Sequence, residues 1–197
     1  MAEMKVTVWN VEDGNAISVE LPNGRLAMID AHATAKFSPI RKVHKENPNR
    51  GVYWLFVTHP HSDHLGDLPT IEELEMGPQV LVRPRDIPEE LIRDGNLDKA
   101  LTEAYLKLDK TYTQDVEPYA DYSDSKNTGG VEITVFRPAS RDTKELNDSI
   151  KQKSDNEFLA KIDIFIPNTQ QIKKINQTHV KKVNNKSQCY LNYGINA

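Results

Sequence analysis

Residues 52–67 read VYWLFVTHPHSDHLGD, an apolar run that changes without a break into a polar, histidine-rich segment. The first six residues are apolar throughout, which predicts a strand covered on both faces. Three imidazoles and one carboxylate follow within six positions: His59, His61, Asp63 and His64. The first two histidines are two positions apart in an extended segment, so both project to the same side, where neutral imidazoles can bind one zinc ion. The stretch therefore predicts a buried strand with a metal site at its end.

Hydrogen-bonded histidines are the alternative to a metal site, and for His32, His44 or His179 taken singly that interpretation is preferred. Three histidines in one short loop favour metal binding instead, because several buried ring donors and acceptors would need other partners if no cation were bound. Imidazole together with carboxylate suits Zn²⁺ and also Mn²⁺ or Fe. We therefore expect one or two metal ions, and a pair about 3.5 to 4 Å apart could share a bridging hydroxide.

Three short strands are predicted before this stretch. Residues 5–11 and 16–21 alternate between apolar and polar side chains, and Asp13-Gly14 marks a tight turn between them. A third strand at residues 26–29 ends at Asp30. The chain should therefore open with an antiparallel meander.

Helices and strands alternate after the meander. The expected elements are helices at 36–46, 67–76 and 97–108 and strands at 80–83 and 131–136. We expect Asp67 to cap the first turn of its helix, where backbone N–H groups lack acceptors. Six residues should form the buried stripe of the helix at 97–108: Leu97, Ala100, Leu101, Ala104, Tyr105 and Leu108. This order of elements predicts an α/β fold.

The HxHxDH motif at residues 59–64 resembles that of the metallo-beta-lactamase superfamily. As in that family, it follows an apolar strand, and Asp30 closes an earlier one; the resemblance covers about residues 4–147. Residues 10–17 and 65–68 look most like the branch that includes the hydrolase domain of bacterial competence DNA-uptake proteins. The resemblance implies a four-layer αβ/βα sandwich with its metal site at the edge of two facing sheets, of which this chain would complete only the N-terminal half.

The resemblance also implies a role for each residue of the motif. His59 and His61 would bind the first metal ion, Asp63 and His64 would bind the second and act in catalysis, and Asp30 would buttress the loop that carries them. Buttressing groups of this kind fix the tautomer and the basicity of the ligands. His32 departs from the family, which usually has glycine two residues after this aspartate. It is then either a surface residue, which is the preferred interpretation, or an additional group at the rim of the active site.

The last 50 residues differ in composition from the rest of the chain. Residues 1–147 hold 17 basic and 25 acidic groups, a net charge of −8, whereas residues 148–197 hold 8 and 4, a net charge of +4. All eight arginines lie at or before Arg141. We therefore divide the chain into a metallo-beta-lactamase-like domain at 1–147 and an atypical Asn-, Lys- and Gln-rich segment at 148–197, whose composition is typical of disorder or of a frame-shifted sequence.

The ligands that the family normally provides downstream cannot be located in the sequence. No strand is predicted before His179, and Asp163 precedes its neighbouring apolar residues instead of following them, so neither is given a ligand role. We therefore expect a truncated or frame-shifted family member that retains the first half-sandwich and half of the ligand set.

Composition excludes several classes of protein. A single cysteine, Cys189, excludes a disulfide scaffold, and the overall charge of −4 excludes a strongly basic nucleic-acid module. No export signal and no run of about 18 apolar residues is visible, which predicts a cytoplasmic protein without a membrane partner. Nucleic acid could contact five lysines of the last segment, although a solvated tail is the preferred interpretation: Lys173, Lys174, Lys181, Lys182 and Lys186.

Two functions are compatible with the sequence. The first is a zinc-dependent hydrolase, in which a metal-activated hydroxide attacks an ester, amide or phosphodiester bond of a small-molecule or phosphodiester substrate. The second is a non-catalytic remnant with partial metal binding, whose half-complete core would expose sheet surface and drive homo-oligomerisation or aggregation.

Overall fold

The antiparallel meander forms as predicted at the start of the chain. In this computed structural model, which describes residues 3–85, 87–95, 98–136 and 160–165, the meander consists of β1 (Lys5–Val8), β2 (Ala16–Glu20) and β3 (Leu26–Ala31). β1 is shorter than the predicted 5–11, because the chain leaves the ladder after the bond from Trp9 N to Ala16 O.

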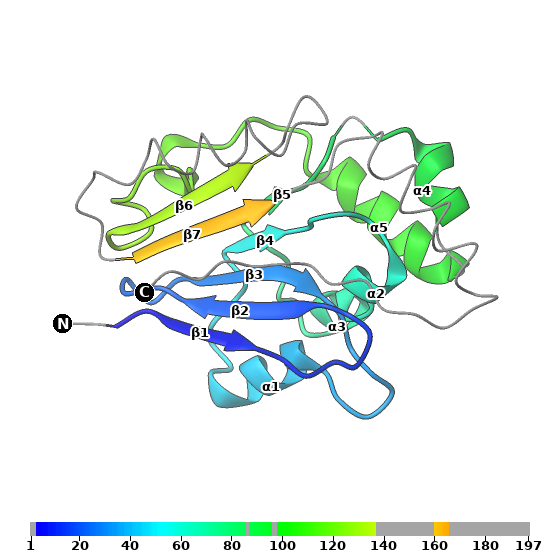
Figure 1. The fold of residues 1–197 in the computed structure, drawn as a ribbon, viewed down its shortest axis with the longest axis horizontal. Helices are drawn as coiled ribbons and strands as arrows, with labels where there is room; N and C mark the ends of the chain where they lie inside the picture. The colour runs from blue at the N-terminus through cyan, green and yellow to red at the C-terminus, as the bar shows by residue number, and fades with distance from the viewer. Residues whose placement is uncertain (1–2, 86, 96–97, 137–159, 166–197) are drawn as a thin grey trace.

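Two further strands extend the meander into a mixed sheet. β4 (Trp54–Phe56) pairs with β3, and β5 (Val80–Val82) pairs with β4, both in parallel register. The order across the sheet is β1-β2-β3-β4-β5 (Figure 1). Each parallel connection carries a helix, as a crossover between parallel strands requires. The α/β class and the mixed sheet are confirmed, whereas the four-layer arrangement stays a prediction.

Helices cover one face of this sheet. The α-helices are α1 (Pro39–Glu46), α2 (Ser62–Leu65), α3 (Leu68–Glu73), α4 (Glu89–Gly95) and α5 (Lys99–Thr111), and a short 3₁₀ turn, η1, lies at Pro118–Ala120. One apolar cluster joins Met28 and Leu55 of the sheet to Ile40 of α1, Ile71 of α3 and Tyr105 of α5. This core fixes the end of β4, and the first histidine of the motif, His59, comes three residues after that end.

A second, two-stranded sheet contributes to the core on the other face. β6 (Val131–Phe136) and β7 (Ala160–Phe165) are parallel (Figure 1). Side chains alternate along a strand, so Ile29 and Phe56 point away from the helices, and they share an apolar cluster with Val131, Ile133 and Ile164. β4 is thus covered on both faces, as its apolar sequence predicts.

Two expectations about helices are wrong in detail. The side chain of Asp67 does not cap α3, because it accepts hydrogen bonds from Ser38 Oγ and Ile40 N at the start of α1 instead. In α5, Ala100 is exposed whereas Thr102 and Leu106 are buried. The buried face of α5 is set by its contacts with α2, α3 and α4, and helical spacing alone does not specify those contacts.

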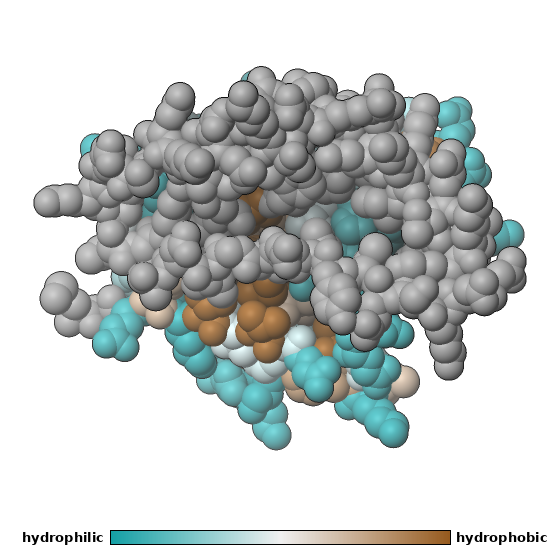
Figure 2. Space-filling view, in the orientation of Figure 1, coloured by the Kyte–Doolittle hydropathy of each residue, from teal (hydrophilic) through white to brown (hydrophobic). Residues whose placement is uncertain are grey.

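The segment 148–197 is described only in part. Residues 160–165 form β7, and the remaining positions, together with Leu97 of the predicted stripe, lie outside the described residues. None of the helices in the described ranges is long and apolar enough to span a bilayer. On the face seen in Figure 2, the described atoms show a small apolar group flanked by polar side chains. Among the described large apolar residues, Val8 at the end of β1 is one of the most exposed.

Replacement of Asp67 should destabilise the protein more than loss of an ordinary helix cap. In Asp67→Ala, Ser38 Oγ and the buried Ile40 N–H lose their acceptor, and we expect the free energy of unfolding to fall by about 2 to 4 kcal/mol. Asp98→Ala, which removes the exposed cap of α5, should cost about 1 kcal/mol. Urea denaturation followed by tryptophan fluorescence measures both, and equal losses would contradict this role for Asp67.

Candidate metal centre

The histidine segment begins where β4 ends and folds back on itself. Val57 N donates to Val82 O as the last bond to β5. A tight turn then forms, in which His61 N donates to His59 O; α2 starts directly after His61, and His64 N donates to His61 O in its first turn. The three histidines are buried, with His59 5%, His61 2% and His64 4% exposed. The turn therefore gathers them in the interior at the carboxyl end of β4.

The imidazole rings lie close together. The ring centroids of His59 and His61 are 4.8 Å apart, and those of His59 and His64 are 3.9 Å apart. His59 thus contacts both other rings. Gathering three nitrogen ligand groups in one small buried volume is what a site for a borderline-soft cation requires.

A carboxylate from the neighbouring strand, Asp30, joins this cluster. Asp30 Oδ1 accepts from Thr58 N at 2.8 Å. Its Oδ2 accepts from Thr58 Oγ1 at 2.7 Å and from Asn15 Nδ2 at 2.8 Å, and it lies 2.7 Å from His64 Nδ1. The carboxylate is fully buried, and its hydrogen bonds compensate the cost of removing it from water.

A β-bulge directs Asp30 toward the cluster. β2 and β3 pair at Ala16 with Ala31 and next at Ile17 with Ile29, so Asp30 has no partner in the register. Its φ of 54° lies in the left-handed region, which aspartate tolerates better than most residues. Bulges re-aim side chains beside functional sites. Such a conformation costs of order 1 to 3 kcal/mol, which the hydrogen bonds of the buried carboxylate offset.

Asp30 and Thr58 determine the tautomers of two histidines. Because Asp30 is a carboxylate, His64 Nδ1 carries a proton toward it, and the lone pair of the neutral ring is then on Nε2. Thr58 Oγ1 donates to Asp30, so it accepts from His59 Nδ1 at 3.1 Å, which places the lone pair of His59 on Nε2 as well. Metal-bound histidines show this carboxylate-supported arrangement.

The electrostatics of His64 increase its basicity. Burial lowers the pKa of His64, but the charge of Asp30, the hydrogen bond to Asp30 and the charge of Asp63 together outweigh burial and raise the pKa above its usual value. A more basic imidazole is a stronger donor to a cation, although protons then compete for the same nitrogen.

Asp63 lies on the other side of His64. Its Oδ2 is 3.6 Å from His64 Nε2, and its side chain is 28% exposed. Two ligands about 2.0 Å from one tetrahedral zinc ion are roughly 3.3 Å apart, so this separation is close to that of a ligand pair. Asp63 Oδ1 is buried and has no hydrogen-bond partner among the described residues. A cation would satisfy that oxygen.

The structure thus brings together the residues that the sequence indicates. His59, His61, Asp63, His64 and Asp30 lie in one cluster, and their donor chemistry fits zinc. Within the described ranges, however, no group of three or more His, Cys, Asp or Glu side chains is arranged to hold a metal ion. The match of this cluster to a zinc site therefore rests on the chemistry of its donor groups and on the pair formed by Asp63 and His64.

Three other residues of the site were missed or misplaced by the sequence analysis. Asn15 and Thr58 bind the Asp30 carboxylate, and the only sequence signal for them is position, in the β1–β2 connection and directly before the motif. His32 was expected at the surface, but it is partly buried, and its Nδ1 lies 3.1 Å from Ser62 O.

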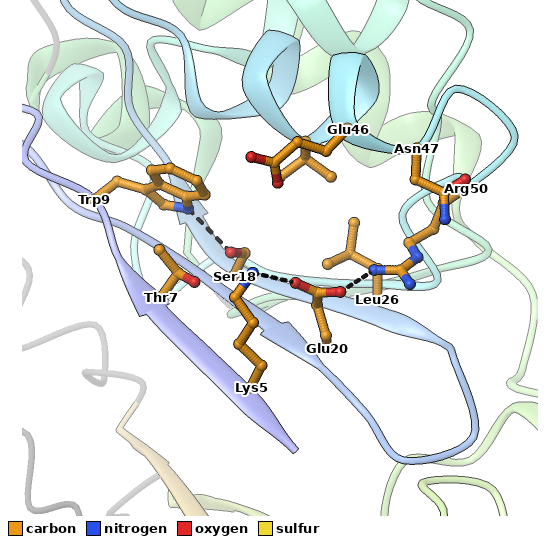
Figure 3. Close-up of a pocket in the computed structure, with 10 residues that line it drawn as sticks. Lys5, Thr7, Trp9, Ser18, Glu20, Leu26, Glu46, Asn47 and Arg50 are labelled. Carbon is orange, nitrogen blue, oxygen red and sulfur yellow. Dashed lines mark hydrogen bonds and ion pairs between the residues drawn. The ribbon is translucent and has the colours of Figure 1, made fainter. Parts of the chain in front are cut away.

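A separate pocket of about 170 Å³ lies between the β1–β2 edge and the end of α1 (Figure 3). Lys5 and Arg50 both form ion pairs with Glu20 there, and Trp9 Nε1 donates to Ser18 Oγ. The residues that line it include none of the histidine cluster. Lys5, Arg50 and Glu20 are thus engaged with one another, Glu46 pairs with Lys42 of α1, and the pocket is not the site at the end of β4.

Comparisons of the chain with protein-family models, with curated proteins and with solved structures found no match.

Neutralising Asp30 should destabilise the protein and loosen the histidine turn. In Asp30→Asn the left-handed backbone is tolerated, but an amide group replaces an oxygen that faces only donors, and we expect a loss of about 2 to 4 kcal/mol in unfolding free energy. Asp115→Asn, at an exposed position, is the isosteric control and should change stability by less than about 0.5 kcal/mol. If chemical denaturation showed that both variants are as stable as the parent protein, the hydrogen bonds of Asp30 would not hold the site together.

Proposed function

We propose that the protein is a metal-dependent hydrolase of the metallo-beta-lactamase type. The observation that carries the proposal is the 2.7 Å contact between Asp30 Oδ2 and His64 Nδ1, which turns the Nε2 lone pair of His64 toward the Asp63 carboxylate. Structural histidines need no such alignment, whereas metal-binding histidines commonly have it. The four-layer sandwich, with its metal site at one edge, is part of the same proposal.

Zinc is the metal that the donor set favours, with Mn²⁺ or Fe as alternatives. His59 and His61 would hold one ion, and Asp63 and His64 would hold a second or complete the first. A bound cation of this kind lowers the pKa of a water ligand to about 7 and stabilises developing oxyanion charge. Asp30 and Thr58 contribute by fixing the ring tautomers, and the partly exposed Asp63 is the motif residue through which water and substrate would reach the buried histidines.

The proposed substrates contain an ester, amide or phosphodiester bond. Because hydroxide would be the nucleophile, the site needs neither serine nor cysteine. In this kind of fold the same metal ligands serve unrelated reactions, and the surrounding loops select the substrate. We propose a small-molecule or phosphodiester substrate from the resemblance of the motif, and a cytoplasmic location from the sequence composition.

A second candidate function is metal binding without turnover. Two observations favour it: no three donors among the described residues form a metal-holding group, and the sequence offers no downstream histidine or bridging aspartate in a family-like position. Such a protein would bind at most one ion weakly. Metal content and hydrolysis measured on the same preparation separate the two functions.

Protein expressed without a histidine tag should be purified with about one to two zinc ions per chain. His61→Ala should lose most of this metal, because it removes an imidazole from the buried cluster. His44→Ala, a substitution of the same type on α1, should retain it. Metal analysis of the three purified proteins measures the difference, and a metal-free parent or an unaffected His61→Ala variant would contradict the proposed metal site.

Zinc-loaded protein should hydrolyse at least one member of a panel of phosphodiester, beta-lactam and thioester substrates. Asp63→Asn should lower kcat/KM by about 100-fold or more, because a neutral amide replaces a charged ligand beside His64. Asp13→Asn, at an exposed turn, is the matched control and should leave the rate unchanged. Stoichiometric zinc without turnover on any member of the panel would favour the non-catalytic alternative.

A further inference from the structure

His32 lies between two glycines that leave room for its ring. A Cβ atom at Gly14 would lie 2.0 Å from His32 Cδ2, and one at Gly66 would lie 2.6 Å from His32 Nδ1. Neither glycine has φ in the left-handed region, so neighbouring atoms, and not an unusual backbone, exclude a side chain: the His32 ring at both positions, and also the backbone Asp63 O, 2.6 Å from a Cβ at Gly14. The ring is thus packed between the β1–β2 connection and the end of α2.

The imidazole also forms a hydrogen bond to the motif turn. His32 Nδ1 lies 3.1 Å from Ser62 O, and because a carbonyl oxygen only accepts, Nδ1 must carry the proton and donate. Ser62 is the first residue of α2, between two predicted metal ligands. The side chain of His32 is therefore bonded directly to the backbone that carries Asp63.

Backbone contacts of His32 lead to the same turn from the opposite side. His32 N donates to Asn15 O at 3.0 Å, and Asn15 N donates to Asp63 O at 2.9 Å. The Asn15 side chain donates to Asp30 as well. Beside His32, Asp67 N donates to Ala31 O at 2.7 Å. Residues 31 and 32 thus hold both the β1–β2 connection and the 62–67 segment.

We propose that His32 is a positioning residue, which locks the turn carrying Asp63 and His64 against the β1–β2 connection and so sets the separation of the metal-binding groups. The metal part of this statement rests on the proposed function, whereas the locking of the turn does not. The family that the motif resembles usually has glycine at this position, which can neither fill the gap nor donate to Ser62. In this chain the imidazole does both, and Gly14 and Gly66 accommodate it.

Three variants separate filling of the gap from donation to Ser62. His32→Ala removes both. His32→Asn retains an N–H donor near the position of Nδ1, whereas His32→Gln is nearly as large as histidine but carries its amide one bond further out. His44→Asn on α1 is the control for loss of an imidazole elsewhere. Each purified protein is examined for zinc affinity by competition with a chelator, and for hydrogen exchange at the Asn15 and Val19 amides by NMR.

We expect His32→Ala and His32→Gln to raise the zinc Kd by about 10- to 100-fold, and His32→Asn to stay within about threefold of the parent protein. The Asn15 amide should exchange about tenfold faster or more in His32→Ala, while Val19 in the centre of β2 should keep its protection. If His32→Ala does not fold, comparison of zinc affinity between His32→Asn and His32→Gln still tests the hydrogen bond to Ser62 O.

Parent-like zinc affinity and Asn15 exchange in all three variants would overturn the positioning role. If His32→Asn and His32→Gln weakened zinc binding equally, the proposed role of the hydrogen bond to Ser62 O would be overturned. A parent protein that binds no zinc would instead count against the proposed function, and the Asn15 exchange rates would still decide whether His32 locks the turn.

Discussion

The buried carboxylate of Asp30 connects the sheet to the histidine cluster. It accepts hydrogen bonds from the backbone and side chain of Thr58 and from Asn15, and it contacts His64 Nδ1. A carboxylate without such partners would be costly to bury, so the burial of Asp30 depends on these groups remaining in place. The position of the histidine turn and the tautomer of His64 both follow from this arrangement.

The parallel pairing of β3 and β4 makes the arrangement possible. Ile29 pairs with Phe56, so the carboxyl ends of the two strands lie side by side, and Asp30 is directly opposite the first residues of the polar segment. Crevices at the carboxyl ends of parallel strands are common ligand sites in α/β proteins. The apolar clusters on both faces of the sheet hold these strand ends rigidly, which a site of defined geometry requires.

Much of the fold could be predicted from local patterns, because apolar periodicity and turn residues mark strands and helices directly. The unbroken apolar run before the motif predicted a doubly covered strand, and Trp54 and Phe56 are fully buried as expected. The partners of Asp67 and His32 could not be predicted in this way. Each side chain has its hydrogen-bond partner about 30 residues away, and only the folded sheet brings those segments together. The bulge at Asp30 is likewise a property of the β2–β3 register, which no single strand specifies.

We propose that Asp30 orients His64 as a metal ligand toward Asp63. A crystal of the zinc-loaded protein, with an anomalous difference map collected at the zinc absorption edge, tests this claim most directly. We expect a zinc peak about 2.0 to 2.2 Å from His64 Nε2 and from an Asp63 carboxylate oxygen, with the contact between Asp30 and His64 Nδ1 retained. A map with no peak at the end of β4, or a peak bound through His64 Nδ1 with Asp30 displaced, would contradict it.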